Sequence, residues 1–363
     1  MTYQAGLIGA GGIAGLGILG MHPEEEIGQR RFRASHAGGY AAADGIELVA
    51  VADIDADTLA TFGEAWGIPA DRRYTDHTAM LAAEDLDAVS VATPSYLHHD
   101  HVVDAAESDA DPGVIWCEKP IAASVAQARE MTDVCRATDT ALVVNHSFRF
   151  TEDIQQLAQL FDDGFLGTVR SVSLSFRREL MRNATHILDL LVYFLDAEPR
   201  RVSGYLNGEN DAVEALQGSP VDDQGGGGHL VTADGTFVTV DCTLARDISA
   251  MTLSFIGTAG KLRIGIDDQD WRYWTLTEDG HVEASLPDID GDWSWNEDYR
   301  DSFPNAATHV VDLLDGGATN RSPGTEATRS LAVIVALFIS EYTGGHVDLP
   351  LDGPLEDVTV TSW

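Results

Sequence analysis

The chain has 363 residues, of which 44% are hydrophobic, so it can bury two globular cores. Its 59 acidic and 22 basic residues give a formal net charge of −37, which argues against nucleic acids and anionic membranes as partners. Because the chain has no run of about 18 apolar residues and no basic segment followed by an apolar one, we expect no membrane span, no signal peptide and a cytoplasmic location.

The acidic residues occur along the whole chain, whereas Lys119 and Lys261 are its only lysines. Repulsion among so many carboxylates is screened in molar salt, where the Debye length is about 3 Å. We therefore interpret the acidity as adaptation to salt and predict a halophilic protein. Cys117, Cys135 and Cys242 follow no metal-ligand spacing, so we expect buried, reduced thiols and no metal site.

In the first part of the chain, short β-branched runs alternate with helical segments. The expected strands cover residues 4–8, 47–52, 88–92, 114–117 and 141–145. The expected helices cover residues 34–43, 56–66, 99–107 and 124–137. This alternation is typical of a parallel sheet with crossover helices, so we predict an α/β fold with a Rossmann domain at residues 1–122.

Further along, strands follow one another without helices between them. They are expected at residues 169–176, 201–206, 236–244, 251–256, 261–266 and 272–277, with loops at 208–228 and 288–301. Helices at 185–195, 306–314 and 325–342 could cover one face of the resulting sheet. We therefore predict an α+β domain at residues 123–363, including the crossover helix and strand at 124–147, with a large, mostly antiparallel, open-faced sheet.

The segment Gly9 to Ala14 reads GAGGIA and follows the first strand, as in the G-x-G-x-x-A fingerprint of dinucleotide-binding loops. Gly9 permits the tight turn, Gly11 lets a pyrophosphate approach the backbone, and Ala14 allows close packing. Gly12 and Ile13 supply amides at the helix N-terminus that follows. Since glycine clusters also form ordinary turns, the pattern needs support from the rest of the domain.

That support comes from Asp53 at the end of the second strand, where a carboxylate can bind the ribose hydroxyls of NAD and repel the 2′-phosphate of NADP. We therefore predict NAD, with NADP less favoured; the alternative is that Asp53 only forms a turn. Ala14 and Asp53 are further apart than the usual spacing of about 20 residues. The surplus is interpreted as an insertion at residues 15–33.

Polar motifs follow the expected strands at residues 88–92 and 114–117. Thr93-Pro94 comes after the first of these and Glu118-Lys119-Pro120 after the second. Ligands bind at the carboxyl ends of strands in doubly wound sheets, so both motifs are candidates for the cofactor site. A chain that has almost no lysine keeps one at this edge, which favours a functional role for Lys119.

With the fingerprint, these motifs make the chain resemble the glucose-fructose oxidoreductase and inositol dehydrogenase (Gfo/Idh/MocA) family over most of its length. The other matching residues are His98, Asn145, Arg149, the segment from Thr185 to Leu191 and the segment from Gly324 to Ala327.

The resemblance implies roles for several of these residues. It places Lys119 beside the nicotinamide and the reacting hydroxyl, commonly with a cis peptide bond before Pro120. It assigns the general base to His186, with Asp189 one helical turn later to orient a histidine or a substrate hydroxyl. Read from the residues alone, His186 could instead pack against the sheet as an ordinary helix-terminal histidine. The resemblance adds these cofactor-site residues: Thr93, Pro94, His98, Glu118, Lys119 and Asn145.

One position departs from the family pattern. Many relatives have an aspartate four residues before the histidine, whereas this chain has Arg182 followed by Asn183. Together with Arg149, these residues are candidates for substrate binding, and the arginines could bind an anionic group. The alternative is that the arginines only pair with surface carboxylates, which contributes about 0 to 1 kcal/mol each.

We therefore expect an NAD-dependent dehydrogenase that oxidises a hydroxyl of a sugar, polyol or sugar derivative by hydride transfer. One alternative is a dehydrogenase of an anionic sugar, such as a uronic acid or nucleotide sugar. Another is a non-catalytic NAD-binding regulator. The resemblance also implies a homodimer or homotetramer formed through the open face of the second-domain sheet.

Overall fold

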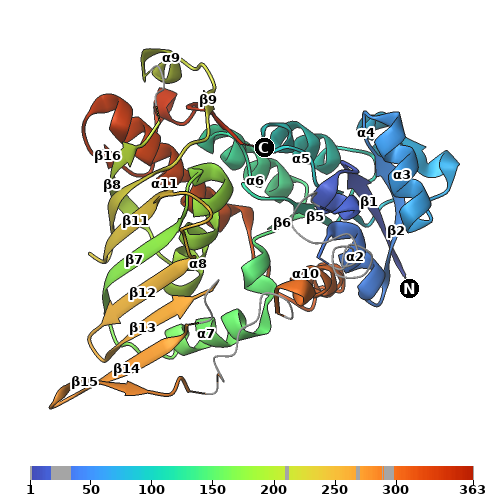
Figure 1. Cartoon of the computed structure of the whole chain (residues 1–363). Helices are drawn as coiled ribbons and strands as arrows, with labels where there is room; N and C mark the ends of the chain where they lie inside the picture. Colours follow the sequence, from blue (N-terminus) through green and yellow to red (C-terminus); the bar gives the residue numbers. More distant parts are fainter. Residues whose placement is uncertain are drawn as a thin grey trace. The chain divides into compact units, whose positions relative to one another are not determined.

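The computed structural model describes residues 2–17, 34–208, 212–266, 270–287, 289 and 298–362. The chain forms two compact units (Figure 1). The first comprises Met1–Ala122, Gln127–Thr151 and Tyr299–Thr325, and the second Ala123–Ala126, Glu152–Asp298 and Glu326–Trp363. Most of the predicted insertion lies outside the described residues. Among those residues, no helix has the length and apolar character needed to cross a membrane.

The described part of the first unit contains a six-stranded parallel sheet in the order β3-β2-β1-β4-β5-β6, the Rossmann sheet. The order reverses between β1 and β4, which is where doubly wound sheets bind their ligands. This confirms the prediction of a Rossmann fold. Its strands are β1 (Tyr3–Ile8), β2 (Ile46–Ala52), β3 (Arg73–Tyr74), β4 (Ala88–Val91), β5 (Val114–Cys117) and β6 (Ala141–Val144).

Helices of the first unit begin at side chains that cap them. The side chains of Ser35, Asp55 and Asp76 accept hydrogen bonds from first-turn amides of α2, α3 and α4. Strand β6, which we assigned to the second domain within residues 124–147, pairs with β5 in the Rossmann sheet. The helices are α2 (His36–Ala42), α3 (Ala56–Trp66), α4 (His77–Ala83), α5 (His98–Ala106), α6 (Val125–Ala137) and α10 (Asp298–Leu314), with short helices η1 (Gly12–Leu16), η3 (Ala70–Arg72), η4 (Ser95–Leu97) and η5 (Ser147–Phe150).

Helix α10 differs from expectation in both length and location. It starts at Asp298, well before the predicted residue 306, and its apolar stripe includes Phe303, Ala306 and Val310. This stripe packs into the core of the first unit with Tyr40 and Trp116 rather than against the second-domain sheet. An amphipathic stripe predicts a helix but does not identify the core that it covers.

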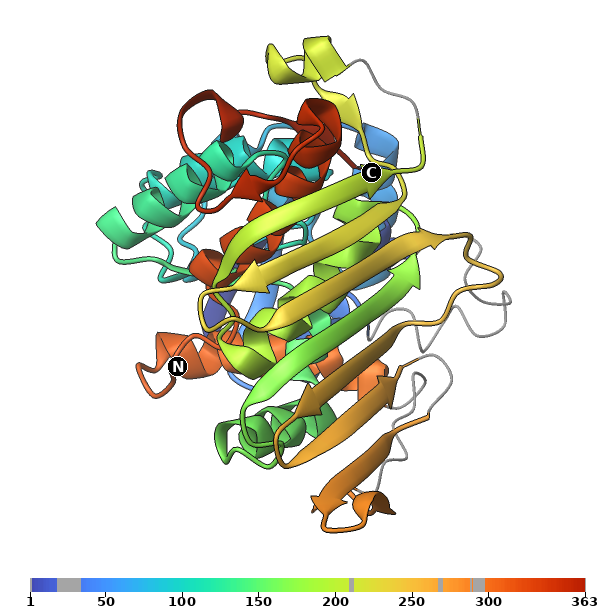
Figure 2. The ribbon, with the colours of Figure 1, turned by 90° about the vertical axis from the view of Figure 1, so that its left-hand side faces the viewer.

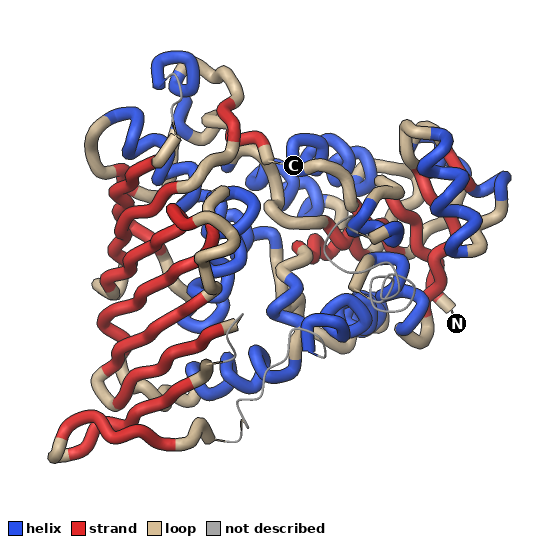
Figure 3. Tube along the Cα trace, viewed as in Figure 1, coloured by secondary structure: helices blue, strands red, loops and turns tan. Residues whose placement is uncertain are grey.

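The described part of the second unit contains a mixed nine-stranded sheet in the order β15-β14-β13-β12-β7-β11-β10-β8-β16, called the large sheet below (Figure 3). All neighbouring pairs are antiparallel except β7 with β11. The predicted mostly antiparallel sheet is confirmed. Its strands are β7 (Val169–Arg177), β8 (Pro199–Leu206), β10 (Gly226–Thr232), β11 (Phe237–Leu244), β12 (Thr252–Gly257), β13 (Gly260–Gly265), β14 (Arg272–Thr277), β15 (Gly280–Ala284) and β16 (Val347–Asp348).

Strand β10 corrects the prediction that residues 208–228 form a loop. A Cβ added to Gly228 would lie 2.0 Å from the carbonyl oxygen of Ser203 in β8. A Cβ added to Gly227 would lie 2.3 Å from the carbonyl oxygen of Val240 in β11. The glycines therefore let β10 pass close to both neighbours, which composition alone does not reveal. The same segment also contains α9 (Ala212–Leu216) and β9 (Val221–Asp222).

Helices α7 (Glu152–Asp162), α8 (Thr185–Leu195) and α11 (Gly324–Thr343) lie on one face of the large sheet (Figures 1 and 2). Aromatic rings of Phe161, Phe194 and Phe255 pack there with centroids 4.9 to 5.9 Å apart. Figure 2 shows the opposite face, which no helix of the described residues covers. The sheet is thus open on one side, as predicted.

Candidate functional site

The fingerprint loop lies at the end of β1 and approaches the end of β4 closely. Gly9 has a φ of +92°, and a Cβ on it would lie 2.9 Å from the carbonyl oxygen of Ala92. Only glycine fits this position without strain. A Cβ on Gly11 would meet nothing within 4 Å, so the backbone there faces open space. The loop thus has the tight turn and the accessible backbone that a pyrophosphate requires.

Asp53 braces this loop from the end of β2. Its Oδ2 accepts a hydrogen bond from the Ala10 amide at 2.7 Å, and its Oδ1 accepts one from the Asp55 amide at 2.9 Å. The turn-forming role that we considered for Asp53 is therefore present. Each carboxylate oxygen can accept a further hydrogen bond, so the ribose role is compatible with it. The adjacent Ile54 is 91% exposed and offers an apolar surface beside the carboxylate.

His98 is buried and connects the loops after β4 and β5. Its Nε2 lies 2.8 Å from the carbonyl oxygen of Thr93, and its Nδ1 lies 2.9 Å from that of Pro120. Burial lowers the pKa of His98, and the carbonyl partners and Glu118 act in the opposite direction. The contacts make His98 a link between the two strand-end motifs that the sequence singled out.

Glu118 is buried at the end of β5 and holds its neighbours in place. Its Oε1 accepts a hydrogen bond from Asn145 Nδ2 at 2.5 Å and lies 3.2 Å from His36 Nε2, while its Oε2 accepts one from the Lys119 amide at 3.2 Å. Burial acts to raise the pKa of Glu118, but the contacts with His36 and Asn145 and the charge of Lys119 outweigh it and hold the pKa below its ordinary value. The group is therefore an ionised carboxylate at neutral pH.

A series of hydrogen-bond contacts leads from this carboxylate through His36 and Ser90 to Tyr40. Tyr40 OH lies 2.8 Å from Ser90 Oγ, which lies 3.0 Å from His36 Nδ1. If the Tyr40 hydroxyl donates to Ser90, Ser90 donates to Nδ1 and Nε2–H donates to Glu118, each group in the chain is satisfied with a neutral imidazole. Glu118, His36, Ser90, Tyr40 and Asn145 form what we call the Glu118 network, which was not predicted from the sequence. The only signal for it was that His36 and Tyr40 stand four residues apart on one helix.

Lys119 lies two residues after the end of β5 and is half-buried. The bond from Lys119 to Pro120 is cis, as the family resemblance implied. Asn145, which follows β6, is buried and donates its backbone amide to the Cys117 carbonyl at 2.7 Å. Lys119 and Asn145 are thus held at the same edge of the Rossmann sheet, at the carboxyl ends of neighbouring strands.

Arg149 has a structural contact within the first unit. Its guanidinium is fully buried, and Nη1 donates to the carbonyl oxygen of Arg321 at 2.9 Å. This links η5 to the segment before α11. The side chain therefore stabilises the fold of this unit, whatever else it contacts.

In the second unit, the short helix η6 (Leu180–Ala184) runs into α8, which begins at Thr185. His186 lies in the first turn of α8 and is half-buried, and Asp189 is buried one turn later. Arg182 is exposed on η6. The candidate residues of this unit therefore lie along one continuous stretch of helix.

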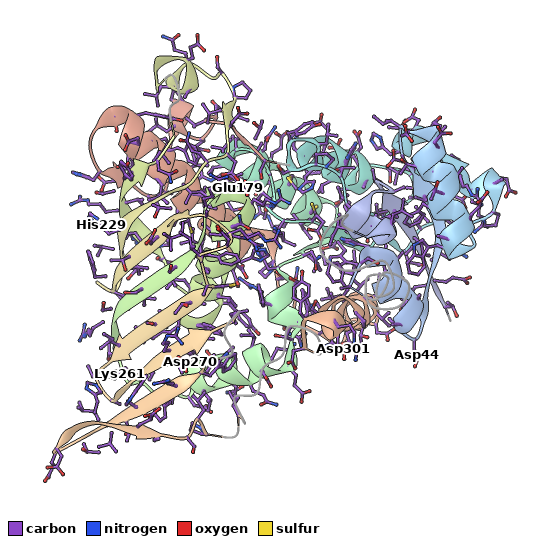
Figure 4. The ribbon with its side chains drawn as sticks, viewed as in Figure 1. Asp44, Glu179, His229, Lys261, Asp270 and Asp301 are labelled. Carbon is purple, nitrogen blue, oxygen red and sulfur yellow. The ribbon has the colours of Figure 1, made fainter. Side chains whose placement is uncertain are left out.

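Asn183 is engaged by the turn before η6. Its Oδ1 accepts from Arg177 Nε at 2.9 Å, and its Nδ2 donates to the Arg178 carbonyl at 2.6 Å and to Glu179 Oε2 at 3.3 Å. Glu179, labelled in Figure 4, has a φ of +82°, a strained value for a residue with a side chain. Asn183 thus fixes a strained turn at the start of the helix.

Lys119 belongs to the first unit and His186 to the second. Within the described residues, no group of three or more His, Cys, Asp or Glu side chains is arranged to hold a metal ion. Two residues near these sites escaped the sequence analysis: Glu179, and Asp223, whose carboxylate binds backbone amides of η6.

Comparison with known proteins matches both halves of the chain. Residues 4–146 match the GFO_IDH_MocA family model, described as an oxidoreductase family with an NAD-binding Rossmann fold. D-apiose dehydrogenase of Paraburkholderia graminis is 30% identical over 362 residues, which cover 93% of this chain and 92% of that protein. D-xylose 1-dehydrogenase (NADP(+)) 2 of Haloferax volcanii is 24% identical, covering 94% of this chain and 99% of that protein.

A solved structure of levoglucosan dehydrogenase, in complex with NADH and levoglucosan, has the same fold. It gives a TM-score of 0.77 at 19% identity and covers 97% of this chain and 100% of that chain. The glycine loop, the strand-end motifs and the sequence match across both units lead to one assignment. The chain belongs to the Gfo/Idh/MocA family of oxidoreductases.

Proposed function

We propose that this chain, an NAD(P)-dependent oxidoreductase that acts on CH–OH groups of sugars, is an NAD-linked dehydrogenase of a neutral sugar or polyol. The observation that carries the proposal is the environment of Lys119. In a chain with two lysines, this one follows a buried strand, and a supported carboxylate, Glu118, fixes its backbone. Such a network is typical of a site that must hold a charged group in place.

The residues at the end of the Rossmann sheet fit NAD. The backbone at Gly11 is open to a pyrophosphate, and the exposed Ile54 can support an adenine ring. The negative charge of Asp53 favours ribose hydroxyls over a 2′-phosphate. We assign Gly9, Gly11, Gly12, Ile13 and Asp53 to cofactor binding, together with Thr93, Pro94, His98, Glu118, Lys119 and Asn145. Comparing the dissociation constants of NAD and NADP tests the preference.

Bound NAD supplies the hydride acceptor for the reacting carbon. His186 takes the proton of the substrate hydroxyl as general base, since an imidazole titrates near neutral pH. The Lys119 ammonium stabilises the negative charge that develops on that oxygen. The carbon thus loses a hydride and the oxygen a proton, which leaves a carbonyl group.

We assign substrate binding to Asp189, Asn183, Arg182 and Arg149. Arg182 is the one whose exposure on η6 would suit an anionic substrate. A screen of aldoses, polyols and sugar acids with NAD separates the two substrate classes. If Arg182→Ala weakens affinity for a sugar acid without changing turnover, the anionic class replaces the neutral one.

Alanine variants of the two catalytic residues provide the main test. Lys119→Ala and His186→Ala are each expected to lower turnover by two or more orders of magnitude, because positioned proton transfer contributes about that much. The dissociation constant for NAD should stay close to wild type. The matched control is Lys261→Ala, which removes the other lysine, held over the Trp274 ring at 4.7 Å.

Two outcomes would contradict the proposal. Near-normal turnover of Lys119→Ala would refute the role of the lysine. Intact NAD binding with no turnover of any sugar, polyol or sugar acid would favour the non-catalytic regulator.

We further propose that the open face of the large sheet joins copies of the chain into a dimer or tetramer. Large side chains project from it, among them Tyr205, which is 60% exposed, Ile256, 47%, and Phe237, 44%. His229, labelled in Figure 4, stacks on Phe237 at 5.5 Å. Such apolar groups on an otherwise acidic protein favour a self-complementary contact. Ile256→Asp is expected to shift the sedimentation equilibrium toward monomer, and an unchanged mass would refute this interface.

The proposal places the enzyme in a reducing, salt-rich cytoplasm. Cys117, Cys135 and Cys242 are buried and free, and burial raises the pKa of each thiol. Such thiols suit a reducing compartment. With a net charge of −37, activity should increase with KCl up to molar concentrations, where the charge is screened over about 3 Å. Highest activity in dilute buffer would refute the halophilic assignment.

A further inference from the structure

The short helix η6, which runs into the helix that carries His186, is capped by the carboxylate of Asp223, the residue that follows β9. Asp223 Oδ1 accepts a hydrogen bond from the Met181 amide, and Oδ2 accepts one from the Arg182 amide, both at 2.9 Å. The first amides of a helix have no partner within it, so one side chain here satisfies two of them. Because η6 continues into α8, this contact fixes the start of the whole segment.

Asp223 is itself held by the C-terminal strand. Strand β17 (Val360–Thr361) pairs in parallel with β9, and the Asp223 amide donates to the Thr361 carbonyl at 3.0 Å. Ser362 Oγ also donates to Asp223 Oδ2 at 3.3 Å. A connection therefore runs from the end of the chain through Asp223 to η6 and on to the turn that holds His186.

The buried position of Asp223 disfavours the ionised form of its carboxylate. Burial raises the pKa of Asp223 to about 6, and the nearby Glu179 acts in the same direction. The two amides and Ser362 oppose the shift, and the Cys242 thiol from β11 is a further titratable group close by. An acid whose folded pKa is raised contributes stability below its unfolded pKa of about 3.9 and loses it as the pH rises through the folded value.

At neutral pH, ionisation of Asp223 therefore lowers the stability of the fold and does not raise it. The ionised form is the one that can accept from both amides, because a protonated oxygen becomes a donor. Groups kept charged at a cost to stability cluster at functional sites. The only candidate catalytic group on the described helix that Asp223 caps is His186.

We propose that Asp223 is a positioning residue of this dehydrogenase, which fixes the first turn of η6 and thereby the direction in which α8 presents His186. The inference rests on the proposed role of His186. Asp223 acts through the backbone of Met181 and Arg182 and makes no contact with substrate. The C-terminal strand β17 contributes to the same positioning, because it holds Asp223 in place.

The test compares Asp223→Asn with a matched cap elsewhere, Asp76→Asn, since Asp76 caps α4 through the Thr78 amide at 2.9 Å. Asparagine can accept from one of the two amides but not from both. We expect kcat of Asp223→Asn to fall about tenfold, a loss of about 1.4 kcal/mol of transition-state stabilisation, with the NAD dissociation constant unchanged. Its thermal midpoint at neutral pH should not be lower than wild type. Asp76→Asn should keep its kcat.

Two further readouts separate positioning from general damage. Protonation of His186 lowers kcat in acid in both proteins, and protonation of Asp223 near pH 6 adds a second loss in wild type, so kcat should fall more steeply with decreasing pH in wild type than in Asp223→Asn. Hydrogen exchange of a peptide covering residues 180–186 should become faster in Asp223→Asn and stay unchanged in Asp76→Asn. Asp223→Glu, which restores the charge, should recover part of kcat.

The outcomes separate the positioning role of Asp223 from the proposed function. If Asp223→Asn keeps kcat within twofold of wild type while His186→Ala is inactive, the positioning role is wrong and the proposed function stands. If His186→Ala is active, the proposed function fails, and exchange of residues 180–186 alone decides whether Asp223 fixes the helix. If Asp223→Asn does not fold, Ser362→Ala takes its place, with kcat expected about twofold lower; unchanged exchange in that variant overturns the proposal.

Discussion

Replacing His36 by alanine tests the Glu118 network most directly. The change removes an imidazole that lies 3.2 Å from Glu118 Oε1 and packs against Trp116 in a tilted arrangement, at a centroid distance of 4.1 Å. A lost hydrogen bond to a charged, buried group amounts to about 1.5 to 3 kcal/mol. Removing a buried ring and leaving a partly filled cavity adds about 1 to 2 kcal/mol. Together these two losses predict a decrease of about 2.5 to 5 kcal/mol in the free energy of unfolding.

The pH dependence of this decrease follows from the direction of the Glu118 shift. The pKa of Glu118 in the folded protein lies below its ordinary value, so its contribution is present above the unfolded pKa of about 4.3. It is lost as the pH falls through the folded value. The difference between wild type and His36→Ala should therefore be largest near neutral pH and shrink in acid to the packing part alone.

Urea titrations followed by circular dichroism, near neutral pH and in acid below about pH 4, measure both quantities. The control is Tyr40→Phe, which removes only the hydroxyl bonded to Ser90 and should lower the free energy of unfolding by about 1 kcal/mol at either pH. Burial raises the pKa of Tyr40, so its hydroxyl stays protonated throughout. A loss below about 1 kcal/mol in His36→Ala, or one that is the same at both pH values, would refute the reasoning.

Three further changes have definite expected results. Asp53→Ser should shift the ratio of NAD to NADP affinity toward NADP by about two orders of magnitude, and equal ratios in fluorescence titrations of wild type and variant would contradict the assignment. Gly228→Ala should lower the free energy of unfolding by about 3 kcal/mol, since its Cβ would lie 2.0 Å from the Ser203 carbonyl oxygen; a wild-type melting temperature would show that β8 and β10 can separate freely. Ser35→Ala should lower it by about 1 kcal/mol, because Ser35 Oγ accepts from the Gly38 amide at 3.0 Å; urea titration checks this, and a loss of only a few tenths of that value would mean that α2 does not need this cap.

Local patterns predicted many elements well. The helix at 56–66 and the strands at 114–117 and 272–277 have the predicted bounds, because their periodicity and flanking residues are properties of the segment itself. The glycines of β10 favour a loop in the sequence, because their role is to let neighbouring backbones approach, and that need arises only in the assembled sheet. Two-residue strands such as β3 are too short to have a pattern.

The candidate site divides in the same way. Lys119, His186 and Asp53 were found because a motif or a strand end marks each of them in the sequence. His36 and Asp223 were missed because their partners, Glu118 and the amides of η6, are distant in the chain. Capping by a side chain from another element leaves no trace in local spacing. Whether Lys119 and His186 meet around one oxygen stays a prediction.

The discontinuity of the first unit has a consequence for biosynthesis. Phe303, Ala306 and Val310 complete the core around Trp116, yet they are translated after almost all strands of the second unit. During translation, the apolar core of the nucleotide-binding half therefore stays incomplete until its last segment emerges from the ribosome. An N-terminal fragment ending near residue 150 should accordingly aggregate or bind chaperones instead of folding as an independent cofactor-binding module.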